Sequence, residues 1–312
     1  MAQQPDPGVA EQGCVVEMND RILPSLKGQA LTTNHTIRAF MFDTGEVVDF
    51  AIASARRRAI ELRAALKRGM GQATSQAWAA HALDSLRALR QPRLDSIYNG
   101  ADDDGSGSVS ALEIAQYFAS QKVKPKRSLL FVWHVGEEAG LYGSEWYTDH
   151  PTVPRDSIVA QLNMDMIGRG AAADNTGITK EGVRYHGNPN YVQLVGSRRL
   201  STELGNLAES VNRGEKHPFT FDYAMDANGH PSNIYCRSDH YEYARYGIPI
   251  IFFTTGGHAD YHQVTDEPQY IDYDRMARVA QYVADLATKV ANLDHRPVVD
   301  KQKPDPHGNC VQ

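Results

Sequence analysis

Three apolar runs of strand length alternate with helical patterns in the second two-thirds of the chain. The runs cover residues 129–133, 158–166 and 248–254. Apolar residues recur at helical spacing in 109–119, where Ser110 and Glu113 could form a capping box, and almost without a break in 276–290. Because the strand runs are nearly continuous in apolar residues, both faces of the sheet must be covered. This pattern predicts a three-layer α/β/α domain.

Outside this region the pattern is weaker. Up to about residue 50 the chain shows only two short β-like runs, 36–42 and 46–52, and we treat residues 1–50 as a poorly defined N-terminal segment. Residues 294–312 lose all periodicity and gain proline, so we expect a loose C-terminal tail. The regular pattern between them places the main domain at residues 95–293.

Composition excludes several classes of protein. Of the 312 residues, 41% are hydrophobic and 22% are charged, which is typical of a globular protein. No apolar run approaches the roughly 20 residues of a membrane-spanning helix. The net charge of −6 gives no reason to expect nucleic acid or an anionic membrane as a partner. The oligomeric state cannot be predicted.

One segment departs from this average. Residues 51–94 contain 12 alanines and carry nine basic residues against two acidic ones, a net charge of +7. The remainder of the chain therefore carries −13. We treat 51–94 as an atypical Ala/Arg-rich segment.

The three cysteines, Cys14, Cys236 and Cys310, are too few and too far apart to indicate a disulfide scaffold or a CxxC zinc site. The first residues also lack the basic and apolar regions of a secretory signal, so none is visible in this chain.

Four acidic or histidine-bearing motifs stand near the ends of the predicted strands, at residues 99–107, 136–140, 163–166 and 260–266. In an open α/β sheet, ligands gather at the carboxyl ends of the strands, so these motifs can converge. Carboxylates and imidazole are suitable zinc ligands, and one carboxylate can bridge two ions. A pair such as Glu137 and Glu138 is usually only a solvated surface. Asp165 is less ordinary, because it lies in a buried-strand pattern and needs a partner.

The first motif also fits a calcium loop. Residues 102–113 place oxygen-bearing side chains at positions 1, 3, 5, 9 and 12 of the EF-hand pattern, with Gly107 at position 6. The context argues against it, because the preceding residues are turn-like, the second half of the loop is already helical in pattern, and there is no second hand.

The stretch from about residue 95 to 292 resembles the M28 family of zinc metallopeptidases, in particular its bacterial exported aminopeptidases. The matching pieces are NGADDDGSG (99–107), VWHVGEEAGLYGS (132–144), LNMDMIG (162–168), RSDHYEYARYGIPIIFFTTGGHADYH (237–262) and HQVTDEP (262–268). The resemblance implies a zinc-exopeptidase-like fold with a mixed, mostly parallel sheet. It also implies two zinc ions and hydrolysis of N-terminal residues from a peptide substrate.

The resemblance assigns a role to each motif. Asp103 would bridge both metals, and its peptide bond to the next residue is often cis in such enzymes. Glu138 and His262 would complete the shell of one metal, while Asp165 would bind the other. Glu137 would be the general base. Ser238, Asp239 and His240 are expected at the rim of the pocket.

The sequence departs from the family at one ligand. The family has a His-x-Asp motif on a strand shortly before the Asp103 segment, but none occurs in residues 1–103. The nearest candidate is His81, followed by Asp84, inside the Ala/Arg-rich segment. On a strand this longer spacing would put the two side chains on opposite faces. The chain could therefore hold one zinc ion instead of two.

A frame slip or rearrangement in the parental gene could have replaced the expected strand with residues 51–94. Sequencing the locus tests this hypothesis, and an uninterrupted frame with no His-x-Asp in either alternative frame would reject it. Two functions stay open: an active zinc aminopeptidase, or an impaired domain that binds metal or peptide without turnover. The resemblance also predicts a periplasmic or secreted protein.

Overall fold

The computed structural model of the protein describes residues 98–312. The predictions for residues 1–50 and 51–94, and the candidate ligand His81, lie outside the described residues. Among residues 98–312, no helix has both the length and the apolar character needed to cross a membrane.

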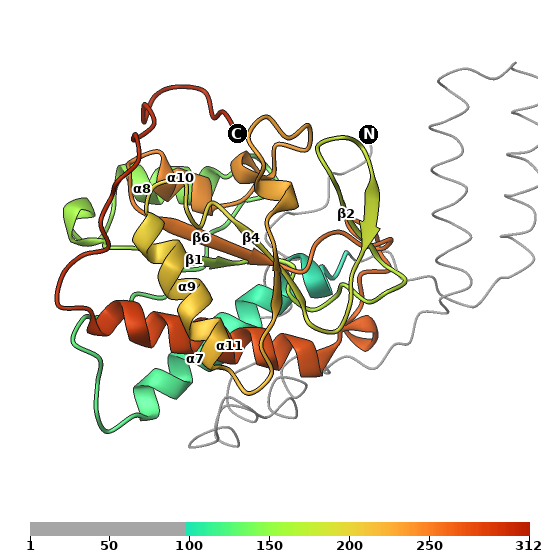
Figure 1. The fold of residues 1–312 in the computed structure, drawn as a ribbon, viewed down its shortest axis with the longest axis horizontal. Helices are drawn as coiled ribbons and strands as arrows, with labels where there is room; N and C mark the ends of the chain where they lie inside the picture. The colour runs from blue at the N-terminus through green and yellow to red at the C-terminus, as the bar shows by residue number, and fades with distance from the viewer. Residues whose placement is uncertain (1–97) are drawn as a thin grey trace, which may run out of the picture.

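A mixed four-stranded sheet forms the centre of the fold (Figure 1). Its order is β1 (Gln161–Met164), β6 (Ile250–Thr254), β4 (Tyr191–Val195) and β5 (Thr220–Asp222). β1 pairs with β6 in parallel, β6 with β4 antiparallel and β4 with β5 in parallel. The mixed, mostly parallel sheet is therefore confirmed. The predicted strands 158–166 and 248–254 exist but are shorter than their apolar runs.

Helices cover both faces of this sheet, as the three-layer prediction requires. On one face lie α7 (Gly107–Ser120), α9 (Thr202–Gly214) and α11 (Tyr273–Asn292), and on the other lie α8 (Tyr142–Asp149) and α10 (His240–Ala244). Strand β6 shows why two cores form: Ile251 and Phe253 join the cluster under α11, whereas Ile250 and Phe252 join the cluster under α10. This alternation follows from the two-residue period of a strand.

The remaining elements are short. A hairpin of β2 (Asn175–Ile178) and β3 (Arg184–His186) stands apart from the main sheet. A single π-type turn, η1 (Ala101–Ser106), precedes α7. The other elements in residues 98–312 are four 3₁₀ turns: η2 (Arg155–Ser157), η3 (Ala224–Asp226), η4 (Ile234–Cys236) and η5 (Pro268–Tyr270).

Both predicted helices are present, and each is longer than its periodic segment. Helix α11 begins where the Asp272 side chain accepts a hydrogen bond from the backbone N–H of Arg275, an ordinary N-cap. The predicted capping box of Ser110 and Glu113 is wrong, because α7 already begins at Gly107. Ser110 therefore lies inside the helix and cannot cap its first turn.

The predicted strand at 129–133 does not form, since it pairs with no other described strand. Its side chains still alternate as on a strand: Leu129 and Phe131 face one core cluster and Val132 faces the other. Leu130 is 54% exposed. Alternation is a local property of the chain, whereas a strand also requires a hydrogen-bonded neighbour.

The C-terminal tail has no helix or strand, but the expectation that it is loose is wrong. A disulfide that the spacing of the cysteines did not predict joins Cys310 to Cys236, next to α10. The last residue, Gln312, is buried, accepts a hydrogen bond from the backbone N–H of Tyr235 and donates to the carbonyl of Met225. These contacts fix the tail against the domain.

Candidate metal centre

The sequence-predicted ligands lie on loops at one edge of the sheet. Asp103 is in η1, Asp165 directly follows β1, and His262 lies in the loop after β6. Because β1 and β6 are parallel, their carboxyl ends meet at the same edge. Glu138 comes from the turn before α8. The structure thus brings residues from four distant segments to one place.

Three of these residues converge closely. The Nε2 atom of His262 lies 3.0 Å from Oδ2 of Asp103 and 2.9 Å from Oε2 of Glu138. One ligand atom from each falls within 4.8 Å of the others, and this is the only such group of three or more among residues 98–312. Two carboxylates and an imidazole are a suitable zinc donor set. The Asp103–Asp104 peptide bond is cis, as the resemblance implied.

Electrostatics at Asp103 favour a cation. Burial raises its pKa to about 10, and the nearby carboxylates of Asp165 and Glu138 add to the effect. Although Nε2 of His262 lies 3.0 Å from its buried Oδ2 atom, no described residue donates a hydrogen bond of good geometry to that atom. Like charges held together out of water need a positive ion to offset their repulsion and desolvation. The residues present therefore fit a zinc ion.

Asp165 faces the same centre from the end of β1. Ser238 donates a hydrogen bond of 2.7 Å to its Oδ2 atom, while its buried Oδ1 atom accepts none from the described residues. Burial raises the pKa of Asp165 to about 7, and the hydrogen bond from Ser238 opposes that rise. Asp165 is not one of the three converging ligands.

Glu137 is half-buried next to the three converging ligands. Burial raises its pKa to about 8, with further contributions from Asp165 and Glu138, and Arg237 lowers it. A carboxylate with a pKa near neutrality can both accept and return a proton, which suits a general base. Glu137 lines the same cavity as Asp103, Asp165 and His262, which has a volume of about 1260 Å³.

The rim of this cavity differs in one residue from the expectation. Ser238 and Asp239 line it. His240 does not: it is fully buried and its ring stacks on Phe252 with 4.6 Å between centroids. As the first residue of α10, it points into the core beneath the helix.

The calcium-loop alternative does not fit the geometry. Three of the oxygens it needs are used by backbone N–H groups: Oδ1 of Asp102 accepts from Gly168, Oδ1 of Asp104 from Met166, and Oγ of Ser106 from Ile167. Positions 6 to 12 of the proposed loop lie within α7. These side chains bind protein backbone instead of converging on an ion.

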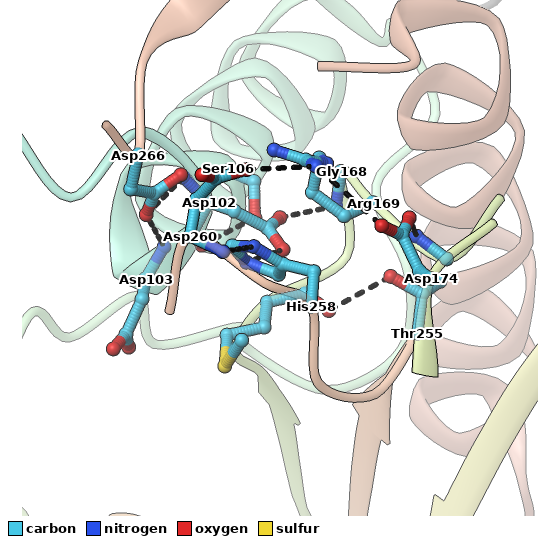
Figure 2. Close-up of polar contacts among 12 residues, drawn as sticks. Asp102, Asp103, Ser106, Gly168, Arg169, Asp174, Thr255, His258, Asp260 and Asp266 are labelled. Carbon is cyan, nitrogen blue, oxygen red and sulfur yellow. Dashed lines mark hydrogen bonds and ion pairs between the residues drawn. The ribbon is translucent and has the colours of Figure 1, made fainter. Parts of the chain in front are cut away.

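Sequence reasoning missed a buried polar network behind the candidate metal ligands (Figure 2). Asp266 accepts hydrogen bonds from the backbone N–H groups of Asp102 and Asp103. His258 lies 3.2 Å from the Asp102 carboxylate, and both side chains are fully buried. Asp266 belongs to the quoted HQVTDEP motif, but nothing in the one-dimensional pattern indicated its partners.

Comparison with known proteins identifies a family and several relatives that the chain resembles. Residues 70–287 match the sequence model for Peptidase family M28. Leucine aminopeptidase 1 of Coccidioides posadasii is 30% identical over 201 residues, which are 62% of this chain and 47% of that protein. Leupeptin-inactivating enzyme 1 of Streptomyces exfoliatus is 41% identical over 78 residues, 24% of this chain and 18% of that protein.

Among solved structures, the LapA aminopeptidase of Legionella pneumophila has a TM-score of 0.49 at 24% identity, over 65% of this chain and 49% of that one. The chain spans about half the length of the leucine aminopeptidases that it matches. The match to the family covers more than half of the chain. The protein therefore belongs to peptidase family M28.

Proposed function

We propose that this protein is a zinc-dependent exopeptidase that hydrolyses N-terminal residues from peptides. The observation that carries the proposal is the convergence of Asp103, Glu138 and His262 within 4.8 Å, beside the half-buried Glu137. The names of the related aminopeptidases support the reaction class. The disulfide supports an exported, periplasmic or secreted protein, because such bonds persist in oxidising compartments.

Each residue has a distinct task in this proposal. Asp103, Glu138 and His262 would hold one zinc ion, and Asp103 with Asp165 would supply ligands to a second. Zinc bound there would act as a Lewis acid that polarises the scissile carbonyl and makes water more acidic. Glu137 takes a proton from the attacking water and returns it to the leaving amine as the C–N bond breaks. Ser238 orients the carboxylate of Asp165.

The alternative is an impaired domain that binds one metal without turnover. It is favoured by one observation: residues 98–312 contain a single converging group of three ligands, and Asp165 is outside it. Zinc content separates the two functions. Two zinc ions per chain with chelator-sensitive hydrolysis of an aminoacyl anilide support the enzyme. One zinc and no hydrolysis, even with added metal, support the impaired domain.

The general base can be tested directly with Glu137→Gln. We expect turnover to fall by about 10²- to 10⁴-fold, the usual contribution of a general base, while zinc content stays the same. Glu145→Gln is the matched control, because Glu145 is an exposed carboxylate on the adjacent helix α8. Equal activity of the two variants would remove Glu137 from the mechanism.

A further inference from the structure

Two loops that carry metal ligands are joined by residues that are not ligands themselves. The loop after β6 contains His262, and it is flanked by His258 on one side and Asp266 on the other. Both flanking side chains are directed at the η1 segment that carries Asp103, as Figure 2 shows for the two labelled residues. The ligand loop is thus held at both ends against the segment that supplies the other ligand.

The contact at Asp266 is the tighter of the two. Its Oδ2 atom accepts hydrogen bonds from the backbone N–H groups of Asp102 and Asp103, each 3.0 Å long, and the same Asp102 N–H also approaches its Oδ1 atom at 3.1 Å. Its own carbonyl accepts from the N–H of Ala101 at 3.2 Å. Asp266 is 1% exposed, so no water competes strongly for these bonds.

The backbone around the ligands requires such support. His262 has a φ of 57° and Met166, directly after Asp165, has a φ of 58°. Side-chain-bearing residues adopt this left-handed conformation only where their surroundings impose it. On the Met166 side, Asp104 accepts a hydrogen bond from the backbone N–H of Met166. Ser106 and Asp102 accept hydrogen bonds from the next two backbone N–H groups. On the His262 side the constraint comes from Asp266 and His258.

We infer that Asp266 is a positioning residue for the metal centre: it fixes the backbone of Asp103 relative to the loop of His262, so that their ligand atoms meet before metal binds. This role rests on the proposed zinc site but concerns a residue that touches no metal. Fixing two ligands in advance removes the conformational entropy that zinc binding would otherwise have to offset.

The loop also offers a matched control. Asp260 is as buried as Asp266, with 2% exposure, and it lies in the same loop. Its carboxylate pairs with Arg169 at 3.1 Å and accepts a hydrogen bond of 2.8 Å from the hydroxyl of Thr265, whereas the backbone N–H of Asp103 donates to Asp266. Loss of either carboxylate disturbs the loop, but only loss of Asp266 releases Asp103.

The experiment compares zinc affinity, by competition with a chromophoric chelator, in the full chain and in Asp266→Ala, Asp266→Asn and Asp260→Ala. We expect Asp266→Ala to lose about 10- to 100-fold in affinity relative to Asp260→Ala, the range found when groups that support metal ligands are removed. Asp266→Asn should recover part of the loss, because one amide oxygen can take the place of Oδ2.

Equal zinc affinity of Asp266→Ala and Asp260→Ala would overturn the inference. If Asp266→Ala does not fold, hydrogen exchange in the wild-type chain decides: the amides of Asp102 and Asp103 should be protected without zinc, and protection that develops only on zinc addition refutes the role. Failure of the wild-type chain itself to bind zinc would overturn the proposed function and the role of Asp266 with it.

Discussion

Zinc binding to this protein should release protons, and the number should depend on pH. The perturbation is a change from pH 8.5 to pH 6.5 in the metal-binding reaction. In the metal-free chain the pKa of Asp103 is about 10 because it is buried and faces other carboxylates. Zinc requires the ionised carboxylate, so the proton on Asp103 must leave when the metal binds.

The number of protons released follows from the pKa values of two proposed ligands, Asp103 and Asp165. At pH 8.5 a group with the pKa of Asp103 is roughly 97% protonated, so zinc binding releases about one proton per chain. At pH 6.5 the carboxyl group of Asp165, whose pKa is about 7, is also largely protonated. It stands about three-quarters protonated at that pH, and the release approaches roughly two protons.

Isothermal titration calorimetry in pairs of buffers with different ionisation enthalpies measures this number directly. The zinc affinity should also rise about tenfold per pH unit near pH 8, the slope expected for one released proton. Asp103→Asn is the control, because an amide has no proton to release. Zinc binding to the wild-type chain without proton release between pH 6.5 and 8.5 would refute the electrostatic description of the site.

Three further predictions test other parts of the structure. Because its pKa is raised, Asp103 holds its proton more readily in the folded chain than in the unfolded one. Its contribution to stability is therefore present below pH 3.8 and is lost as pH rises toward about 10. The Tm of the metal-free chain should fall from pH 6 to pH 9, and a rise would contradict this. Ser238→Ala removes a hydrogen bond that lowers the pKa of Asp165. The pH below which the chain stops binding zinc should therefore rise by as much as about one unit, which zinc titrations at several pH values measure. Reduction of Cys236–Cys310, 74 residues apart, should lower the free energy of unfolding by roughly 4 kcal/mol on the chain-entropy model. Denaturant titrations with and without reductant, with peptide mapping of the bond, check the last of these.

The sequence by itself determined the elements with strong local signals. Residues 276–290 and 248–254 became α11 and β6, because amphipathic periodicity and a continuous apolar run need no distant partner to be recognised. The motifs around Asp103, Glu138, Asp165 and His262 also identified the family. The residue types in these motifs and the order of the motifs along the chain can be read directly from the sequence.

Tertiary structure decided everything that depends on a partner. Residues 129–133 have the alternation of a strand but no described strand beside them, and the C-terminal tail is fixed through Cys236 and Gln312. The acidic residues next to the proposed ligands show the same dependence on a partner. In the sequence Asp102 and Asp266 resemble the proposed ligand Asp103, yet one pairs with His258 and the other binds backbone N–H groups. Burial and hydrogen-bond geometry, which distinguish a ligand from its support, exist only once the loops have met.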